Sequence, residues 1–293
     1  MVSVHMLTYN HAPYIAKAIE SVLMQEVSFD YELVIGDDCS TDETGAIVRE
    51  YRDRYPGIIR LHQQKTNLGL YANQEIVRRS CRGKYIAWLE GDDFWTCSKK
   101  LQKQVSMMEN HPEYSCSFHR CRWIESGLAP RIFGPPSTEP FFTLDDLLMY
   151  GHFVPTGSLV VRNHLREEYP SWMKESEIMD MSYLILFAQH GDLGFIDEVM
   201  SCYRHHRSGL FSGKDASEKV KRVMFTHELA GRNLDLNKRR SFKIGMSRMY
   251  GNLCTVQLQN RQIFRSIWSL LLSIYWSPRH RLSKIFRRLS AQR

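Results

Sequence analysis

The sequence lacks both of the glycine-rich loops by which many proteins bind nucleotide phosphates. No G-x-G-x-x-G follows the first predicted strand, and no G-x-x-x-x-G-K-[ST] occurs anywhere in the 293 residues. These absences exclude a dinucleotide-binding loop and a P-loop. Phosphate groups would have to be held in another way, and a divalent metal on a cluster of acidic residues is the simplest substitute.

Cysteine pairs with metal-binding spacing are also absent. The seven cysteines are an odd number without a C-x-x-C motif, and no secretory segment precedes the first predicted strand. We therefore expect reduced thiols in a cytosolic compartment. Cys116 and Cys121 are expected to be packing residues, because their spacing and lack of partners do not make a zinc site.

Acidic residues are missing from the end of the sequence. Residues 261–293 contain eight Lys and Arg residues and no Asp or Glu. Removing these eight positive charges from the net charge of +7 leaves −1 on the other 260 residues. The basic character therefore belongs to this segment, and it does not indicate a domain that binds nucleic acid.

No apolar run is long enough to span a bilayer. The stretch 263–276 is interrupted by Arg265, and Pro278 separates it from a predicted basic amphipathic helix at 282–289. We predict that residues 261–293 lie in the headgroup region on the anionic inner surface of the cytoplasmic membrane. The alternative is that residues 263–276 pack on the protein as an ordinary core helix.

What is present is the pattern of an α/β domain with a full core. Hydrophobic residues make up 43% of the chain and aromatic residues 12%, which suits one large domain with an appendage. Four predicted strands alternate with three predicted helices in the first 95 residues, as in a doubly wound α/β sheet. The strands are predicted at 2–7, 31–35, 57–62 and 84–89, and the helices at 15–25, after 41–42 and at 70–81.

The second half of the chain is predicted to continue this alternation before it becomes helical. Thr143 and Asp146 form a capping box at the start of a short helix. A loop rich in Pro and Gly at 127–140 is expected to mark the change between two functional halves. The other predicted elements are a helix at 99–110, strands at 114–124, 158–162 and 194–203, a helix at 176–190, and helices between 215 and 259.

Acidic residues end the fourth predicted strand. The stretch KYIAWLEGDDFW at 84–95 runs from an apolar strand, buried on both faces, into Glu90, Asp92 and Asp93. We expect these acids to meet the ends of the first two strands at one edge of the sheet, where ligands bind. Converging carboxylates repel one another unless a cation neutralises them, which favours Mg²⁺ or Mn²⁺. The alternative is an ordinary turn rich in Asp and Gly.

Taken in order, these motifs resemble the inverting family 2 glycosyltransferases of the GT-A fold. Several spaced motifs together are more specific than any one of them. The metal motif departs from the D-x-D of the family, because Glu90 stands at its first position and adds a methylene. The matching stretches are VSVHMLTYNHAPYIAKAIESVLMQ at 2–25, YELVIGDDCSTDET at 31–44, TNLGLYAN at 66–73, GKYIAWLEGDDFW at 83–95 and DLGFIDEVMSCYRHH at 192–206.

The resemblance spans roughly residues 2–210 and implies a Rossmann-like, doubly wound mixed sheet there; it is silent on the rest, which the residue pattern predicts to be a helical C-terminal extension. Residues 1–212 would form the GT-A catalytic domain. Within it, residues 1–125 would bind the nucleotide sugar and residues 126–212 the acceptor. Residues 213–293 would form the helical extension.

The resemblance also implies a donor site and a metal site. Thr8, Asn10 and Asp38 would hold the base and ribose, while Glu90 and Asp92 would orient the ribose and bind Mn²⁺ or Mg²⁺ on the diphosphate. The full set expected to bind the nucleotide sugar is Thr8, Tyr9, Asn10, Asp37, Asp38, Asn67, Glu90, Gly91, Asp92 and Arg204. The expected metal ligands are Asp92, Asp93 and His206.

Structural roles remain open for several of these residues. Asp37 and Asp38 can act as turn formers, and Asn67 is better explained by turn chemistry than by ligand contact. His206 and the histidine before it can lie on a solvated edge.

Asp180 occupies the position where the enzymes that this sequence resembles place the general base. An acceptor hydroxyl is a poor nucleophile at neutral pH, so a carboxylate within hydrogen-bond reach must take its proton. A metal with Arg204 or His206 would stabilise the departing nucleoside diphosphate. Attack from the opposite face inverts the anomeric centre, and one base carboxylate suffices. The alternative is that Asp180 caps the helix through Leu186.

These expectations describe a metal-assisted inverting glycosyltransferase. It would move a sugar from a nucleotide-diphosphate sugar, UDP by family frequency with GDP and dTDP open, to a hydroxyl of a glycan or lipid-linked acceptor. The resemblance implies bacterial surface-polysaccharide synthesis, whereas the cysteines and the basic end of the sequence predict a cytoplasmic protein peripheral on the membrane. One alternative is a sugar-nucleotide nucleotidyltransferase, which would need a glycine-rich phosphate loop. The other is a non-catalytic nucleotide-sugar binder or scaffold.

Overall fold

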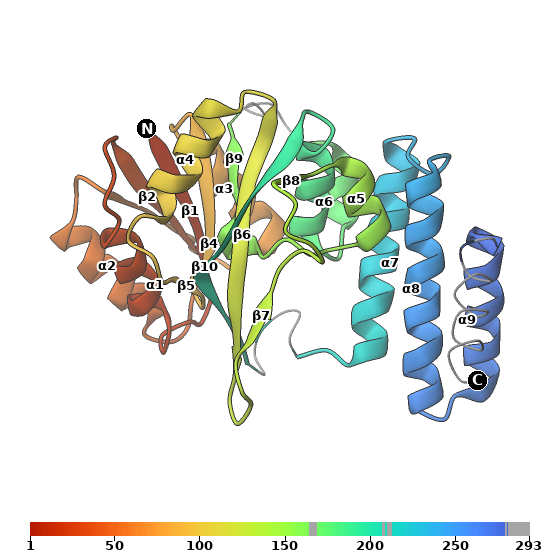
Figure 1. The fold of residues 1–293 in the computed structure, drawn as a ribbon. Coiled ribbons are helices and arrows are strands. Elements are labelled where there is room, and N and C mark those ends of the chain that lie inside the picture. Colours follow the sequence, from red (N-terminus) through yellow and green to blue (C-terminus); the bar gives the residue numbers. More distant parts are fainter. Residues whose placement is uncertain (164–168, 207–208, 210–212, 279, 281–293) are drawn as a thin grey trace. The chain divides into compact units, whose positions relative to one another are not determined.

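The structure, a computed structural model, describes residues 1–163, 169–206, 209, 213–278 and 280. Helices and strands alternate through the first half of the chain, and three long helices follow the last strand (Figure 1). The strands are β1 Val2–Thr8, β2 Tyr31–Asp37, β3 Ile59–Gln63, β4 Tyr85–Glu90, β5 Phe94–Trp95, β6 Tyr114–Glu125, β7 Arg131–Phe133, β8 Phe141–Phe142, β9 Val160–Arg162 and β10 Asp192–His205. The helices are α1 Ile15–Leu23, α2 Thr44–Arg54, α3 Leu70–Ser80, α4 Lys100–Asn110, α5 Leu144–Tyr150, α6 Met179–Phe187, α7 Ala216–Asn233, α8 Arg240–Gln259 and α9 Ile263–Trp276, with 3₁₀ turns at Thr156–Ser158 and Ser171–Glu175.

The chain divides into two compact units, each described here by itself. The first consists of Met1–Phe142, Phe153–Tyr169 and Phe187–His206, and the second of Thr143–His152, Pro170–Leu186 and Arg207–Arg293. Our division of the chain after residues 125 and 212 stays a prediction about function.

The first unit is built on one mixed sheet with the order β3-β2-β1-β4-β9-β6-β10-β5, to which β7 and β8 add at β6 and β10. β1 pairs in parallel with β2 and β4, and β2 pairs in parallel with β3. β9 is antiparallel to both of its neighbours, whereas β6 and β10 are parallel to each other. The predicted mixed, doubly wound sheet is therefore confirmed, and β4 is buried along its length as its apolar sequence indicated.

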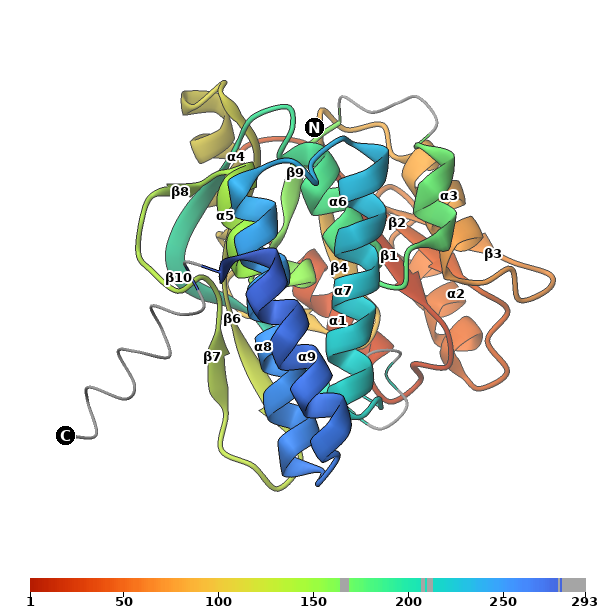
Figure 2. The ribbon, with the colours of Figure 1, turned by 90° about the vertical axis from the view of Figure 1, so that its right-hand side faces the viewer.

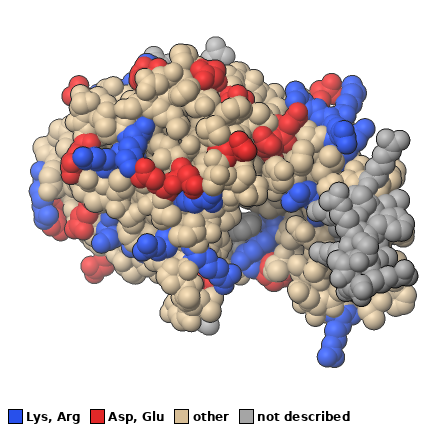
Figure 3. Space-filling model, in the orientation of Figure 1, with Lys and Arg blue, Asp and Glu red and all other residues tan. Residues whose placement is uncertain are grey.

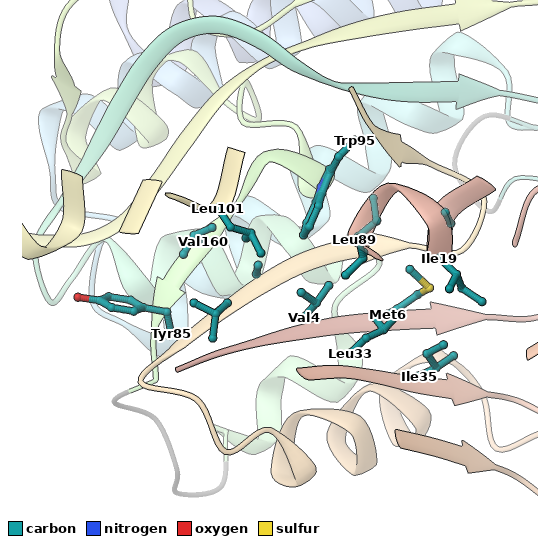
Figure 4. Close-up of a cluster of buried hydrophobic side chains, with 14 of the residues drawn as sticks. Val4, Met6, Ile19, Leu33, Ile35, Tyr85, Leu89, Trp95, Leu101 and Val160 are labelled. Atoms are coloured by element: carbon teal, nitrogen blue, oxygen red, sulfur yellow. The ribbon is translucent and has the colours of Figure 1, made fainter. Parts of the chain in front are cut away.

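The core of the first unit lies between the parallel strands and the helices that connect them. Alternate residues of β1 and β2, such as Val4, Met6, Leu33 and Ile35, are fully buried and cluster with Ile19 of α1 (Figure 4). Successive strand residues point to opposite faces, so each strand supplies one such row to this cluster. The helix α2 packs on β3, α3 on β1 and β2, and α4 on β6.

Several boundaries differ from the sequence-based prediction. The loop predicted at 127–140 contains β7, which returns along the end of β6 with Cys121 opposite Phe133. The helix predicted at 176–190 is shorter and spans Met179–Phe187. The strand predicted from Ser158 begins at Val160, because residues 156–158 form a 3₁₀ turn. Short elements such as these are fixed by pairing with distant segments, which a local pattern does not contain.

The second unit is helical, and α5, α7 and α9 each pack on α8. The predicted capping box of α5 is present, with the Thr143 and Asp146 side chains each accepting a hydrogen bond from the other's backbone N–H. At the α5–α8 contact, a Cβ on Gly245 would lie 1.9 Å from the carbonyl oxygen of Leu148, so the two helices require a glycine there. The basic helix predicted at 282–289 lies outside the described residues.

The surface charge, the hydropathy of the helices and the state of the cysteines can each be compared with the sequence-based expectations. Figure 3 shows acidic and basic side chains interspersed on the visible face of the first unit, without one large field of a single sign. Of the helices that the structure describes, none combines the length and the hydropathy needed to cross a bilayer. The seven cysteines are free thiols.

Candidate active site

The carboxyl ends of β1, β2 and β4 meet at one edge of the sheet, as the sequence predicted. The parallel register places Thr8 opposite Asp37 and Leu7 opposite Glu90. Beyond the strands, the N–H of Asp38 donates to the carbonyl of Thr8 (3.1 Å), and the N–H of Gly91 donates to that of Leu7 (2.8 Å). Three polar clusters that are far apart in sequence therefore form one rim.

The loop after β1 is held by its own asparagine. Asn10 adopts the left-handed conformation with φ 55°, which asparagine tolerates better than most residues. Its side-chain oxygen accepts the N–H of Thr41 (2.8 Å), and its own N–H donates to Ser40 (3.0 Å). This link fixes the first loop against the second and leaves the Tyr9 ring exposed at the surface.

The two aspartates after β2 organise separate parts of the rim. Asp37 is fully buried, and its carboxylate accepts hydrogen bonds from the Ser40 backbone and from the side chain of Gln63. The two oxygens of Asp38 accept the N–H groups of Leu68 (2.7 Å) and Gly69 (2.9 Å). Both aspartates therefore shape the rim through loop contacts, Asp38 by holding the loop that precedes α3.

Asn67 belongs to the loop that Asp38 holds. Its side-chain oxygen accepts the N–H of Gly69 (3.1 Å), and Gly69 has φ +82°, a conformation that favours glycine. This is the turn chemistry that the sequence indicated for this pair.

The motif after β4 depends on close approach between two loops. Glu90 lies half-buried at the end of the strand. A Cβ on Gly91 would lie 2.8 Å from the hydroxyl of Thr8 and 3.0 Å from Nδ1 of His11, so only glycine fits there without displacement. The Thr8 hydroxyl is buried and has no hydrogen-bond partner among the described residues.

Asp92 lies between two histidines. Its Oδ2 is 3.0 Å from Nε2 of His206 and 3.7 Å from Nε2 of His11. The His206 ring also packs on Tyr14, with ring centroids 4.9 Å apart. The structure thus brings His206, at the end of β10, to the acidic motif of β4, as the sequence predicted.

The histidines keep Asp92 ionised. Burial acts to raise the pKa of Asp92, but the hydrogen bond from His206 and the charge of His11 outweigh it and lower the pKa below its ordinary value. The pKa of His11 is itself lowered, because burial outweighs the attraction of Asp92. His11 was not among the predicted site residues. Its only signal was its place directly after Thr8 to Asn10, at the carboxyl end of the first strand.

Asp93 has the opposite environment. It is buried, and its Oδ1 accepts the backbone N–H of Arg204 (2.8 Å). Burial, reinforced by the charge of Asp92, raises the pKa of Asp93 well above its ordinary value. The Arg204 side chain donates to the backbone carbonyl of Asp92 and lies over the Phe94 ring, 4.4 Å from its centroid. Asp93 and Arg204 therefore tie β10 to the end of β4.

His205, the neighbour of His206, does not lie on a solvated edge. Its Nδ1 is 3.2 Å from Oε1 of Glu125, and its ring stacks on Trp123 with centroids 5.3 Å apart. These contacts belong to the pairing of β10 with β6.

The predicted metal ligands do not form a three-residue cluster. No group of three or more His, Cys, Asp or Glu side chains in the described part of the chain is arranged to hold a metal ion. Asp93 points into the β10 contact, which leaves Asp92 and His206 adjacent at the rim. The ionised carboxylate oxygen of Asp92 fits Mn²⁺ or Mg²⁺, since such ions often take only one or two protein carboxylates together with substrate phosphates, and the adjacent imidazole nitrogen suits Mn²⁺ better than Mg²⁺.

Asp180, in the second unit, is paired with a histidine. It lies in the first turn of α6, where its Oδ1 accepts the N–H of Met181 (2.9 Å). Its Oδ2 is 3.3 Å from Nε2 of His152. Burial acts to lower the pKa of His152, but the charge and hydrogen bond of Asp180 outweigh it and raise this pKa. His152 was not predicted, because nothing in the sequence links it to a residue 28 positions away.

Comparisons with known proteins agree with the fold and identify the family to which the chain belongs. The family model described as Glycosyl transferase family 2 matches residues 3–165. A Mycobacterium tuberculosis relative, the uncharacterized protein Rv1520, is 35% identical over 210 residues, which are 71% of this chain and 60% of that protein. The putative glycosyltransferase EpsE of Bacillus subtilis is 28% identical over 250 residues, or 84% of each chain. The chain thus spans about 60% of the length of the mycobacterial relatives that it matches.

Two solved structures share the fold. S. aureus TarS 1–349 in complex with UDP-GlcNAc superposes with a TM-score of 0.57 at 16% identity, covering 99% of this chain and 92% of that one. The mannosyltransferase PcManGT from Pyrobaculum calidifontis, in complex with GDP-Man and Mn²⁺, gives a TM-score of 0.62 at 15% identity, covering 94% and 73%.

Proposed function

Because the chain belongs to glycosyl transferase family 2, we propose that it transfers a sugar from a nucleotide-diphosphate sugar to a hydroxyl of a glycan or lipid-linked acceptor, with inversion at the anomeric centre. The chain is a glycosyltransferase with the GT-A fold. The observation that carries the proposal is the meeting of Asp92 and His206 at the rim where β1, β2 and β4 end. UDP is the first candidate nucleotide, since TarS was solved with UDP and with UDP-GlcNAc.

The donor's base and ribose are proposed to lie on the loops after β1 and β2. Each carboxylate oxygen can accept more than one hydrogen bond, so Asp38 can hold Leu68 and Gly69 and still accept from a base edge. The exposed Tyr9 ring offers a face for the base. The remaining proposed donor contacts are Thr8, Asn10, Asp37, Asn67, Glu90, Gly91, Asp92 and Arg204.

Asp92 and His206 are the residues proposed to hold a divalent metal, with the buried Asp93 supporting them from behind. When bound, the metal would neutralise the diphosphate as it leaves. The lowered pKa of Asp92 supports this role, because a metal ligand must be ionised. Arg204 adds a cation next to Asp92, positioned by its packing on Phe94.

Asp180 is proposed as the general base that takes the proton from the acceptor hydroxyl. His152 supports this assignment, because a paired imidazole fixes the carboxylate in one orientation and favours its ionised form. The Met181 N–H holds the other carboxylate oxygen.

The proposed setting is bacterial surface-polysaccharide synthesis at the inner face of the cytoplasmic membrane. One relative, 35% identical over 118 residues, is the putative teichuronic acid biosynthesis glycosyltransferase TuaG of Bacillus subtilis. The acid-free segment 261–293 supports attraction to an anionic membrane surface, where lipid-linked acceptors reside.

Calorimetric titration of UDP, GDP and dTDP, each with and without Mn²⁺, tests the donor site. We expect one nucleotide to bind tightly only with the metal. Asp92→Asn should weaken that binding by at least about 10- to 100-fold, the range seen when only an outer-shell partner of a metal ligand is removed. Asp53→Asn, at a side chain 66% exposed, is the matched control and should change nothing.

Failure of every nucleotide to bind under both conditions would contradict the proposal. Metal-dependent hydrolysis of the donor then separates an enzyme from a non-catalytic nucleotide-sugar binder. A nucleotidyltransferase would instead form a nucleotide sugar from a nucleoside triphosphate and a sugar phosphate.

A further inference from the structure

The helix α9 turns its large apolar side chains outward. Phe264 is 91% exposed, Tyr275 75%, Trp268 64% and Ile263 60%, and Ile267 and Leu271 are each more than half exposed. These residues recur along the length of α9. So many large exposed apolar side chains on one helix are unusual for a protein that is surrounded only by water. Figure 2 shows α9 lying along α8 with its opposite side toward the viewer.

The fully buried residues of α9 are serines, and half-buried apolar residues such as Trp276, which packs on Phe242 of α8, lie beside them. Ser266, Ser269 and Ser273 are buried, at spacings of three and four residues. The hydroxyl of Ser269 donates to Gln257 of α8 (2.8 Å). Ser273 and Ser247 exchange hydrogen bonds, each hydroxyl donating to the other's backbone carbonyl, at 2.6 and 2.7 Å.

This arrangement reverses that of a water-exposed amphipathic helix, which buries its apolar stripe and exposes its polar face. Small hydroxyl residues between helices, with large apolar side chains outside, are the packing pattern of helices in lipid. In lipid, small residues let the two helix backbones approach closely, and their hydroxyls form hydrogen bonds between the helices. The large apolar side chains on the outer face are then buried against the lipid.

An open groove lies on the same surface. It has a volume of about 390 Å³ and is lined on the α8 side by Tyr250 and Leu253 and on the α9 side by Phe264, Trp268 and Leu272. Arg265, Gln257 and Ser269 also line the groove. A largely apolar groove that includes a cation suits an acyl chain with a phosphate headgroup.

We propose that the outward face of α9 inserts into the headgroup and upper acyl region of an anionic bilayer, with the α8–α9 pair as a monotopic membrane anchor. Trp268 and Tyr275 have the amphipathic rings that concentrate at membrane interfaces. At about 1.5 Å per residue, the 14-residue helix is roughly 21 Å long, which suits lying in the interface.

Charge favours a bilayer over a second copy of this chain as the occupant. Arg261 and Arg265 flank the start of α9, and residues 277–293 add six bases without an acid. In a symmetric dimer through this face, the like charges of the two copies would approach one another, whereas anionic lipid attracts both the bases and the apolar side chains. The proposal does not depend on the sugar-transfer chemistry.

Flotation of the full chain with vesicles tests it. One set contains phosphatidylcholine alone and the other phosphatidylcholine with phosphatidylglycerol. The protein should float with the anionic vesicles, and the combined variant Phe264→Gln, Trp268→Gln, Tyr275→Gln should reduce the bound fraction at least tenfold. All three side chains are exposed, so the variant should fold and keep its nucleotide binding and thermal transition.

A matched control replaces exposed apolar side chains elsewhere. Leu128→Gln with Ile132→Gln changes two residues that are 51% and 54% exposed around the β6–β7 turn and should leave flotation unchanged. Equal flotation of the α9 variant and the native chain would overturn the proposal. So would a concentration-dependent dimer, seen by light scattering and lost in the α9 variant, if the native chain does not float.

Discussion

At the residue scale, adjacent aspartates have opposite environments. Asp92 lies beside two imidazoles that keep it ionised, whereas Asp93 is buried under the backbone of Arg204 and has a strongly raised pKa. The sequence could identify the acidic motif but not this difference, because the imidazoles come from His11 and His206, on two other parts of the chain. Which carboxylate of an acidic motif stays ionised depends on the side chains that surround it in the fold.

Asp180 and its histidine give a prediction at the same scale. Asp180→Asn should leave the affinity for the donor nucleotide unchanged and lower kcat for transfer at least 100-fold, because the amide cannot take a proton. Calorimetry and a transfer assay with radiolabelled donor measure the two quantities separately. Normal turnover of Asp180→Asn would rule out this residue as the base.

His152→Asn tests the same pair in a graded way. The variant should lower kcat about tenfold and shift the acidic limb of the pH–rate profile upward, since the raised pKa of His152 reflects its attraction to the Asp180 carboxylate, which the variant removes. His111→Asn, at a side chain 46% exposed, is the control and should leave the profile in place. An unchanged profile in His152→Asn would mean that the pairing has no part in the reaction.

At the element scale, long periodic segments were predictable and short paired ones were not. The parallel strands β1, β2 and β4 and the helices α3 and α4 lie where their hydrophobic patterns placed them, because each pattern extends over several residues. The two-residue strands β5 and β8 exist only through pairing with β10, whose sequence lies about 50 to 100 positions away. Helix α9 was predicted, but burial of its serines was not, since an apolar pattern alone cannot say which face meets protein.

The contact between α7 and α8 makes stability depend on pH. His227 of α7 stacks on Phe242 of α8 with centroids 4.5 Å apart, and neither ring nitrogen has a hydrogen-bond partner among the described residues. Burial lowers the pKa of His227 from 6.5 to about 4. The unfolded chain therefore binds more protons than the folded one between these values, so stability is present above pH 6.5 and falls as the pH drops toward 4.

The shift corresponds to roughly 3 to 4 kcal/mol at most. Urea unfolding at pH 7.5 and pH 4.5 should show that His227→Phe loses less stability on acidification than the native chain. The variant retains the part of the loss due to His5, whose pKa burial also lowers to about 4. An identical loss in both proteins would show that His227 becomes protonated without unfolding.

At the scale of the whole molecule, charge and apolar exposure lie on the same segment. The 260 residues before Arg261 carry a net charge of −1, and the remaining 33, which include α9 with its exposed apolar side chains, carry +8. Electrostatic attraction to anionic lipid and burial of apolar side chains in the bilayer depend differently on salt concentration. Salt screens charges over about 10 Å at 0.1 M but leaves apolar burial intact.

Vesicle flotation can therefore separate the two attractions. Arg261→Gln with Arg265→Gln should weaken binding to anionic vesicles roughly 30-fold, at about 1 kcal/mol per base near the surface, and should leave binding to neutral vesicles unchanged. Raising the salt to about 0.5 M should weaken binding of the native chain to anionic vesicles at least as much, because it screens all eight bases. The variant of Phe264, Trp268 and Tyr275 should instead lose binding to both kinds of vesicle. If the arginine variant and the aromatic variant lost binding to neutral and anionic vesicles to the same extent, charge attraction and apolar insertion would not contribute separately. The orientation proposed for α9 would then be wrong.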